Sequence, residues 1–95
     1  MIRNIDVSVA RAFLAVVETG GVTLAARQLN LTQGAISQQI RRLEELSVGR
    51  LFGRVGRRVV LTPEGQRLVP TAKQFVAAND KLLAALSPAG REISV

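Results

Sequence analysis

The chain is organised around residues 32–44, which read TQGAISQQIRRLE and form an amphipathic pattern. Thr32 is a residue type that caps a helix start, and the apolar residues Ile36, Ile40 and Leu43 recur at spacings of four and three, which place them on one stripe. The remaining helix surface carries Gln33, Gly34, Ser37, Gln38 and Arg41. Amide, hydroxyl and guanidinium groups suit contacts to base edges and phosphates, so the stretch predicts a DNA recognition helix. An ordinary solvated helix face has the same composition, and this stretch by itself leaves both interpretations open.

The preceding residues favour the DNA interpretation. Residues 23–31, TLAARQLNL, predict a short capped helix whose paired alanines permit close packing against a crossing helix. Asn30 tolerates the left-handed conformation that ends such a helix, and Thr32 then caps the next one. A short helix, an asparagine turn and a second capped helix form a helix-turn-helix pattern.

An earlier helix is predicted from about Ser8 to Thr19, with Asp6 or Ser8 as its cap and Gly20-Gly21 ending it. Its apolar positions cover much of the circumference, and they are Val9, Ala10, Phe13, Leu14, Val16 and Val17. A helix that is apolar on so many sides packs against several neighbours. We therefore expect it to be the central brace beneath the other helices.

A basic hairpin is predicted after the recognition helix. Residues 51–54 and 59–61 have strand composition, and they bracket the tip 55–58, which contains Arg57 and Arg58. Beside a helix-turn-helix, such a wing is placed to touch the DNA backbone or enter a minor groove. An exposed loop whose arginines only confer solubility is the alternative. Arg54 lies in a strand, where its side chain can face either way.

Thr62-Pro63-Glu64 is a strong helix start, with a hydroxyl cap, a first-turn proline and an acid near the positive end of the dipole. We expect this helix to continue to Ser87-Pro88, roughly 37 Å, which exceeds what the domain's own core needs. Heptad spacing places six residues on one seam, namely Leu68, Ala72, Phe75, Asn79, Leu82 and Leu86. The seam predicts a dimerisation helix over residues 64–86. A long amphipathic helix that packs only on its own domain is the alternative.

Composition restricts the function classes. The 95 residues have a net charge of +6, with thirteen Lys and Arg against seven Asp and Glu, and eleven of the thirteen are arginines. Such a balance favours a polyanionic partner. The chain has no Cys and no His, so we expect no enzyme activity, no metal site and no cofactor. Basicity alone does not distinguish nucleic acid from an anionic membrane surface. The longest apolar run, residues 13–17, is too short to span a bilayer, and we expect no membrane partner and a cytoplasmic location.

Many of these positions also resemble the amino-terminal DNA-binding domain of LysR-type bacterial transcriptional regulators. The resemblance covers roughly residues 5–87 and rests on Ala25-Ala26, Leu29, Thr32-Gln33, Ala35-Ile36-Ser37, Gln39-Ile40, Leu43-Glu44, Leu51-Phe52, Leu61-Thr62, Glu64 and Gly65. It implies a homodimer paired through the long helix, and a small-molecule effector that binds a larger domain absent from this chain. It also implies binding to an interrupted inverted repeat of double-stranded DNA, within the bacterial nucleoid.

Three departures from the family pattern stand out. Val22 replaces a usual aromatic residue, which predicts a core repacked around a smaller side chain. Gly34 replaces a common proline, which we expect either to loosen the helix start or to allow closer approach to DNA. Ser47-Val48-Gly49 replaces a usual Leu-Gly, so the turn after the recognition helix is expected to shift by a residue.

The sequence therefore predicts a mainly α protein, a winged helix-turn-helix with a three-helix core and a two-stranded wing, followed by a long dimerisation helix. Expected domains are 1–62 for DNA binding, 63–87 for the linker helix and 88–95 for the start of an effector domain. The expected function is sequence-specific DNA binding, and the alternative is a low-specificity architectural DNA binder. Base contacts are assigned to Gln33, Ser37 and Gln38. Contacts to the backbone or minor groove are assigned to Thr32, Gly34, Arg41, Arg54, Arg57 and Arg58, although Arg41 and Arg42 have the alternative of local ion pairs with Glu44 and Glu45.

Overall fold

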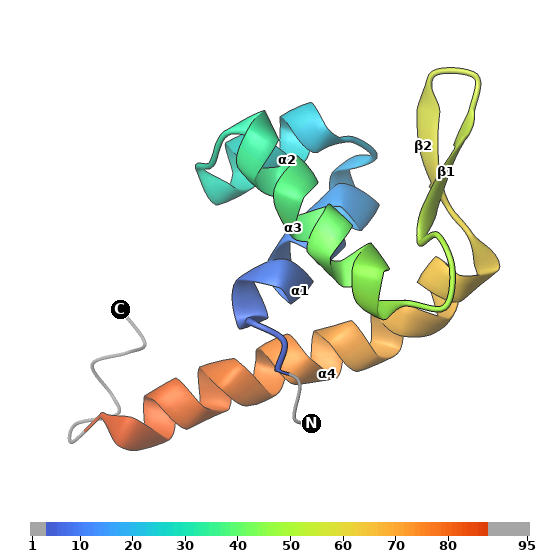
Figure 1. The fold of residues 1–95 in the computed structure, drawn as a ribbon. Helices are drawn as coiled ribbons and strands as arrows, with labels where there is room; N and C mark the ends of the chain where they lie inside the picture. The colour runs from blue at the N-terminus through green and yellow to red at the C-terminus, as the bar shows by residue number, and fades with distance from the viewer. Residues whose placement is uncertain (1–3, 88–95) are drawn as a thin grey trace.

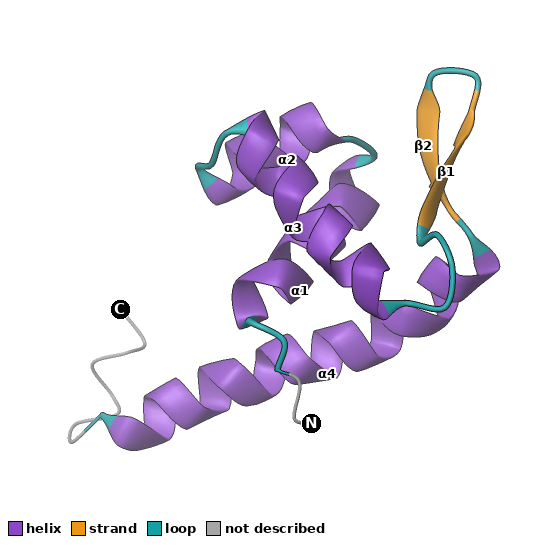
Figure 2. Cartoon of the chain, viewed as in Figure 1, coloured by secondary structure: helices purple, strands orange, loops and turns teal. Residues whose placement is uncertain are grey.

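A computed structural model of the protein describes residues 4–87 and shows a mainly helical fold (Figure 1). The elements, in chain order, are α1 (Val7–Thr19), α2 (Val22–Leu29), α3 (Gln33–Leu46), β1 (Phe52–Val55), β2 (Arg58–Leu61) and α4 (Pro63–Leu86). Helices α1, α2 and α3 form a compact core above α4, and the β1–β2 hairpin stands beside them (Figure 2). This architecture confirms the predicted winged helix-turn-helix with a long final helix. The region predicted to begin an effector domain, residues 88–95, lies outside the described residues.

Helix α1 is the central brace that its composition predicts, since it packs against α2, α3 and α4. Its start is capped by Asp6, whose Oδ1 accepts a hydrogen bond from the backbone N–H of Ser8 at 2.9 Å, and this bond lowers the pKa of Asp6. Gly20 ends the helix in the left-handed conformation, with φ of 84°. The buried side differs in detail from the prediction. Ala12 and Ala15 are buried, whereas Leu14 and Val17 are only half-buried.

The helix-turn-helix forms as predicted at its turn. Asn30 has φ of 59°, and its backbone N–H donates to the carbonyl of Arg27 at 3.2 Å. Ala25 and Ala26 are both buried where α2 crosses its neighbours. The predicted start of α2 was wrong by one residue, because the helix begins at Val22 and its N-cap is Gly21. Glycine has no side chain with which to cap the helix.

The tip of the wing is shorter than predicted, because β1 is shifted by one residue relative to the predicted strand 51–54 and β2 is one residue longer than the predicted strand 59–61. Val55 pairs with Arg58, so both belong to the strands and only Gly56-Arg57 form the loop. Gly56 has φ of 63° at the first loop position, which is the glycine requirement of a type II′ hairpin turn. A two-residue turn of this type matches the twist of the two strands, so their pairing continues as far as Val55 and Arg58. At the base of the wing, the rings of Phe52 and Phe13 lie 5.5 Å apart.

Helix α4 begins at the predicted cap, where the Oγ1 of Thr62 accepts a hydrogen bond from the backbone N–H of Gly65 at 3.1 Å. Its 24 residues span about 36 Å. Pro70 lies inside this helix and removes one backbone donor from it, although the sequence predicted no interruption before Ser87-Pro88. The helix nevertheless continues past Pro70 to Leu86, and the proline is exposed on its outer side.

The first half of α4 belongs to the domain's own core. Leu68 and Val69 pack against it, and Ala72 is only 6% exposed. Further along, Nη2 of Arg11 on α1 lies 2.6 Å from Oδ1 of Asp80, an exposed ion pair that ties the C-terminal part of α4 to α1. The helix then continues beyond the body of the domain (Figure 1).

Candidate nucleic-acid interface

The two sides of α3 have the predicted characters. Ile36 is fully buried and Leu43 is 6% exposed, so the apolar stripe faces the core. The outward side carries four exposed residues and one half-buried serine, which are Gln33, Gly34, Gln38, Arg41 and Ser37. The helix therefore presents to solvent the residues that the sequence analysis assigned to DNA contact.

The start of α3 combines an exposed glycine with a capping hydroxyl. Oγ1 of Thr32 accepts a hydrogen bond from the backbone N–H of Ala35 at 3.0 Å, and its own proton remains available for donation. A Cβ added at Gly34 would meet only Oγ1 of Thr32, at 4.0 Å. Gly34 therefore fills no packing role, and the helix starts at Gln33. Unpaired N–H groups and the helix dipole make this end favourable for a phosphate.

The outward polar side chains of α3 have no partners in the part of the chain that the structure describes. Among residues 4–87, no side-chain hydrogen bond or ion pair involves Gln33, Ser37, Gln38 or Arg41. Gln39, one position further along, differs because its Nε2 lies 3.4 Å from Oγ of Ser8 on α1. The outward side chains of α3 are thus free to bind another molecule.

The alternative of local ion pairs at the end of α3 is not realised in the described structure. Arg41 and Arg42 form no ion pair there, and Glu44 turns instead toward the backbone of the wing. Arg42 is exposed. Both guanidinium groups therefore have no ion-pair partner among the described residues and are available for a phosphate contact.

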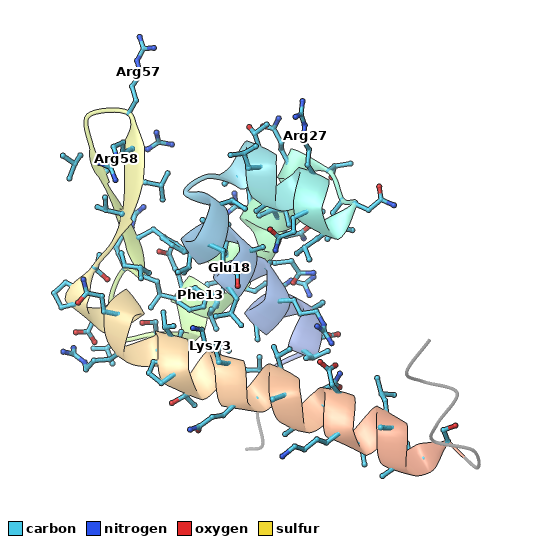
Figure 3. All side chains as sticks on the ribbon, turned by 180° about the vertical axis from the view of Figure 1, so that it is seen from behind. Phe13, Glu18, Arg27, Arg57, Arg58 and Lys73 are labelled. Carbon is cyan, nitrogen blue, oxygen red and sulfur yellow. The ribbon has the colours of Figure 1, made fainter. Side chains whose placement is uncertain are left out.

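The wing carries its arginines on exposed positions. Arg57 lies in the loop and points away from the body, Arg58 is the first residue of β2, and Arg54 lies on β1 (Figure 3). Arg27 on α2 points to the same side as Arg57, away from α4. Sequence reasoning did not single out Arg27, although its place in the last turn of α2 marks it as an exposed cation.

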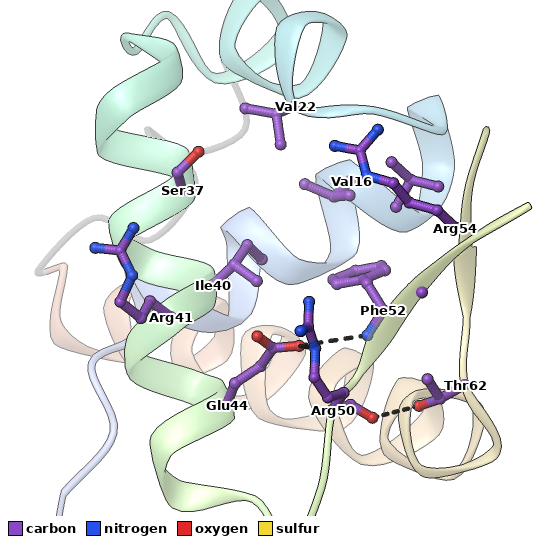
Figure 4. A pocket seen from close by; sticks show the side chains of 12 residues that line it. Val16, Val22, Ser37, Ile40, Arg41, Glu44, Arg50, Phe52, Arg54 and Thr62 are labelled. Carbon is purple, nitrogen blue, oxygen red and sulfur yellow. Dashed lines mark hydrogen bonds and ion pairs between the residues drawn. The ribbon is translucent and has the colours of Figure 1, made fainter. Parts of the chain in front are cut away.

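A cavity of about 630 Å³ separates α3 from the wing (Figure 4). Its floor is apolar and includes Val16, Val22 and Phe52. Its rim carries Ser37 and three arginines, which are Arg41, Arg50 and Arg54. Val22 is half-buried here, so the residue that replaces an aromatic side chain borders open space. Sequence reasoning also missed Arg50, which lies just before the predicted strand and carried no spacing signal.

The predicted seam on α4 divides into two parts. Leu68 and Ala72 pack on the domain's own core, and they also line a groove beside Phe75. The C-terminal part is open, with Phe75 39%, Leu82 60% and Leu86 69% exposed, and Asn79 is half-buried between them. A groove of about 440 Å³ adjoins this part beside Phe75, and Ile5 and Leu43 also line it.

Residues 4–87 contain no group of three or more Asp, Glu, His or Cys side chains that could hold a metal ion. None of the helices described here is long and apolar enough to cross a membrane.

Helices α2 and α3 form a helix-turn-helix, and the β1–β2 hairpin beside them is the wing. This arrangement places the protein in the winged helix-turn-helix class. Residues 8–66 match the model of the bacterial regulatory helix-turn-helix protein, lysR family. The chain belongs to the LysR family.

Relatives in this family are longer than the chain. The transcriptional regulator DgdR of Burkholderia cepacia is 36% identical over 88 residues, which cover 93% of this chain and 30% of DgdR. An uncharacterised regulator of Azotobacter vinelandii, from the ibpB-leuC intergenic region, is 38% identical over 89 residues, which cover 94% of this chain and 62% of the relative. The chain thus spans less than two thirds of the length of either relative.

Solved structures of similar proteins have the same fold. The BenM DNA-binding domain in complex with catB site 1 DNA has a TM-score of 0.77 and 34% identity, and the match covers 84% of this chain and 90% of that one. Oxidised OxyR of Corynebacterium glutamicum has a TM-score of 0.83 and 29% identity, and the match covers 92% of this chain and 27% of OxyR.

Proposed function

We propose that this chain binds double-stranded DNA sequence-specifically, as the DNA-binding part of a LysR-type bacterial transcriptional regulator. The observation that carries the proposal is the face of α3 whose polar side chains have no partner among the described residues, set beside an arginine-tipped wing. Similarity to the BenM DNA-binding domain, solved with DNA, supports it. The net charge of +6 agrees with a polyanionic partner.

Within this proposal, α3 lies in the major groove, and Gln33, Ser37 and Gln38 contact base edges. A second set holds the protein on the backbone or in the minor groove, namely Thr32, Gly34, Arg41, Arg54, Arg57 and Arg58. Arg27 and Arg50 join this second set, because they flank α3 as exposed cations on α2 and at the base of the wing.

The chain pairs with a second copy through the C-terminal part of α4. Exposed Phe75, Leu82 and Leu86 support this arrangement, since exposed apolar side chains at heptad spacing favour a partner helix. Asn79 lies on the same seam, where a polar residue sets register. Two-fold symmetry would place two copies of α3 on an interrupted inverted repeat.

The protein acts as a regulator without catalysis or cofactor, in the bacterial cytoplasm and on the nucleoid when bound to DNA. Its relatives are transcriptional regulators, which supports this role. A small-molecule effector would bind a domain that these 95 residues do not include, and the greater length of the relatives supports that division.

Selection of bound duplexes from a random DNA library, at moderate salt, tests the proposal directly. We expect enrichment of a dyad-symmetric motif. Gln33→Ala or Ser37→Ala should then weaken binding to the selected duplex by ~1–3 kcal/mol, and non-specific binding should change little. Gln74→Ala removes an exposed amide from α4 and is the matched control, with no expected effect.

Binding without enrichment, or equal loss on every sequence, would instead support the low-specificity architectural alternative. Contacts to phosphates also require that affinity fall steeply as salt rises. Absence of duplex binding even at low salt would refute both interpretations.

A further inference from the structure

Glu44 turns away from the DNA-facing side of α3 and toward the wing. Its Oε2 accepts hydrogen bonds from the backbone N–H groups of Leu51, at 2.9 Å, and Phe52, at 3.4 Å (Figure 4). The side chain is 22% exposed, so most of this carboxylate is shielded from water. Bonds from backbone N–H groups to an ionised carboxylate are stronger than neutral ones, and low exposure reduces competition from water.

The same short segment is held from its other side by the start of α4. The hydroxyl of Thr62 donates a hydrogen bond to the carbonyl of Arg50 at 2.5 Å. The backbone N–H of Thr62 donates to the carbonyl of Leu51 at 3.0 Å. Leu51 is only 2% exposed. Residues 50–52 therefore form a joint at the wing base, fastened to α3 by Glu44 and to α4 by Thr62.

Beyond this joint, the wing and α3 face each other across open space. The cavity of about 630 Å³ lies between them, with Ser37 and Arg41 on one side and Arg54 and Val59 on the other. A four-residue strand is about 13 Å long, so a rotation of about 10° at its base moves the tip by about 2 Å. Binding groups need to be held within about 0.5 Å or 10–20° to act together. The joint thus controls the spacing between α3 and the tip.

We propose that Glu44 is a positioning residue: it sets the angle of the wing relative to α3, so that Arg57 and α3 engage one duplex together. The inference rests on the proposed DNA-binding function and assigns Glu44 no contact with DNA. Glu44 acts on affinity through Arg57, and its loss leaves the face of α3 intact. Its Oε2 also lies 3.9 Å from Nε of Arg50, and the coupling to Arg57 distinguishes a change of wing angle from the loss of this pair.

Glu45 provides a matched control, because it is the next residue of α3, carries the same charge, is exposed and forms no ion pair or hydrogen bond within residues 4–87. Removing either carboxylate raises the positive charge near the duplex by one unit. Electrostatics alone therefore predicts that Glu44→Ala and Glu45→Ala both bind slightly more tightly. The positioning role predicts that Glu44→Ala binds more weakly.

The experiment is a double-mutant cycle on the selected duplex, measured by fluorescence anisotropy. Arg57→Ala should lower affinity roughly tenfold in the unsubstituted protein and in Glu45→Ala. Glu44→Ala alone should lower affinity by a similar factor, and adding Arg57→Ala to it should cost less than about twofold. Hydroxyl-radical footprints should lose protection beneath the wing in Glu44→Ala and keep it beneath α3.

Equal affinities for Glu44→Ala and Glu45→Ala, or an undiminished effect of Arg57→Ala in the Glu44→Ala background, would overturn the inference. Should Glu44→Ala fail to fold by circular dichroism, Glu44→Asp replaces it in the same cycle. The shorter side chain keeps the charge and withdraws the carboxylate from Leu51, so the same coupling is expected and its absence overturns the inference equally. If the unsubstituted protein bound no duplex, the proposed function would fail instead, which is a separate result.

Discussion

Helices α3 and α4 begin with the same local arrangement, and the protein uses the two starts in opposite ways. In each, a threonine hydroxyl accepts a hydrogen bond from the backbone N–H three residues on, Thr32 from Ala35 and Thr62 from Gly65. A glycine lies in each first turn. A Cβ on Gly34 would meet nothing closer than 4.0 Å, whereas one on Gly65 would lie 2.2 Å from the carbonyl oxygen of Leu51.

The difference shows that one capping pattern can serve either binding or packing, depending on what surrounds it. The start of α3 is exposed and uncommitted, as suits contact with a ligand. The start of α4 is packed against the base of the wing, where Gly65 is buried and Thr62 makes two further bonds. Substitutions at matched positions can therefore separate the two roles.

The largest effect is expected for Gly65→Ala. Its new methyl would overlap the backbone of Leu51, which cannot move without displacing the wing, so stability should fall by ~2–3 kcal/mol. Urea denaturation measures the change, and Gly34→Ala is the matched control. Stability of Gly65→Ala equal to that of the unsubstituted protein would show that the joint is not tightly packed.

A smaller difference is expected between the two capping threonines. Thr62→Ala loses its cap and the bond to the carbonyl of Arg50, which should cost about 2 kcal/mol, whereas Thr32→Ala loses only a cap, at about 1 kcal/mol. Thr62→Ser keeps the hydroxyl and should recover most of the loss. Equal costs for the two alanine variants in thermal unfolding would refute the contrast between an open and a closed start.

Gly34→Ala should stabilise the protein by up to about 1 kcal/mol, because alanine favours the helix and the added methyl meets open space. It should nevertheless weaken binding to the selected duplex, since that methyl occupies the DNA-facing side. Thermal unfolding and anisotropy measure the two effects. Unchanged DNA affinity would mean that the backbone at Gly34 does not approach the duplex.

The smallest effect is expected at the exposed ion pair between Arg11 and Asp80, which joins α1 to α4 without burial. The hydrogen bond from Arg11 lowers the pKa of Asp80 below its ordinary value of 3.8. The pair therefore stabilises the fold fully above that value and loses its contribution as pH falls through the lower folded pKa. Thermal unfolding of Asp80→Asn should differ in pH dependence only below about pH 4. If the difference in melting temperature between Asp80→Asn and the unsubstituted protein changed between pH 5 and pH 7, the assignment would be contradicted.

Local patterns in the sequence account for much of the fold. Thr32, Asn30 and Gly20 all have the cap or turn role that their residue types predict, because these roles depend on neighbouring backbone groups. Periodicity likewise places Ile36 and Leu43 in the core. The family resemblance agrees with the helical architecture and with the LysR family match. The assigned DNA-contact residues remain predictions, although α3 and the wing expose them as expected.

Features that depend on long-range contacts could not be read from spacing. Periodicity assigned Leu68 and Ala72 to a dimer seam, and packing of α4 on α1 placed Ala72 in the core. Glu44 and Glu45 are the same residue type at adjacent positions, yet only Glu44 reaches the N–H groups of the wing base. The sequence by itself determined the caps, the turn and the apolar faces, since each depends on residues within about one helical turn. The tertiary structure alone decided which glycine is enclosed, which carboxylate is bonded and which part of α4 is free, because each depends on segments that only the folded chain brings together.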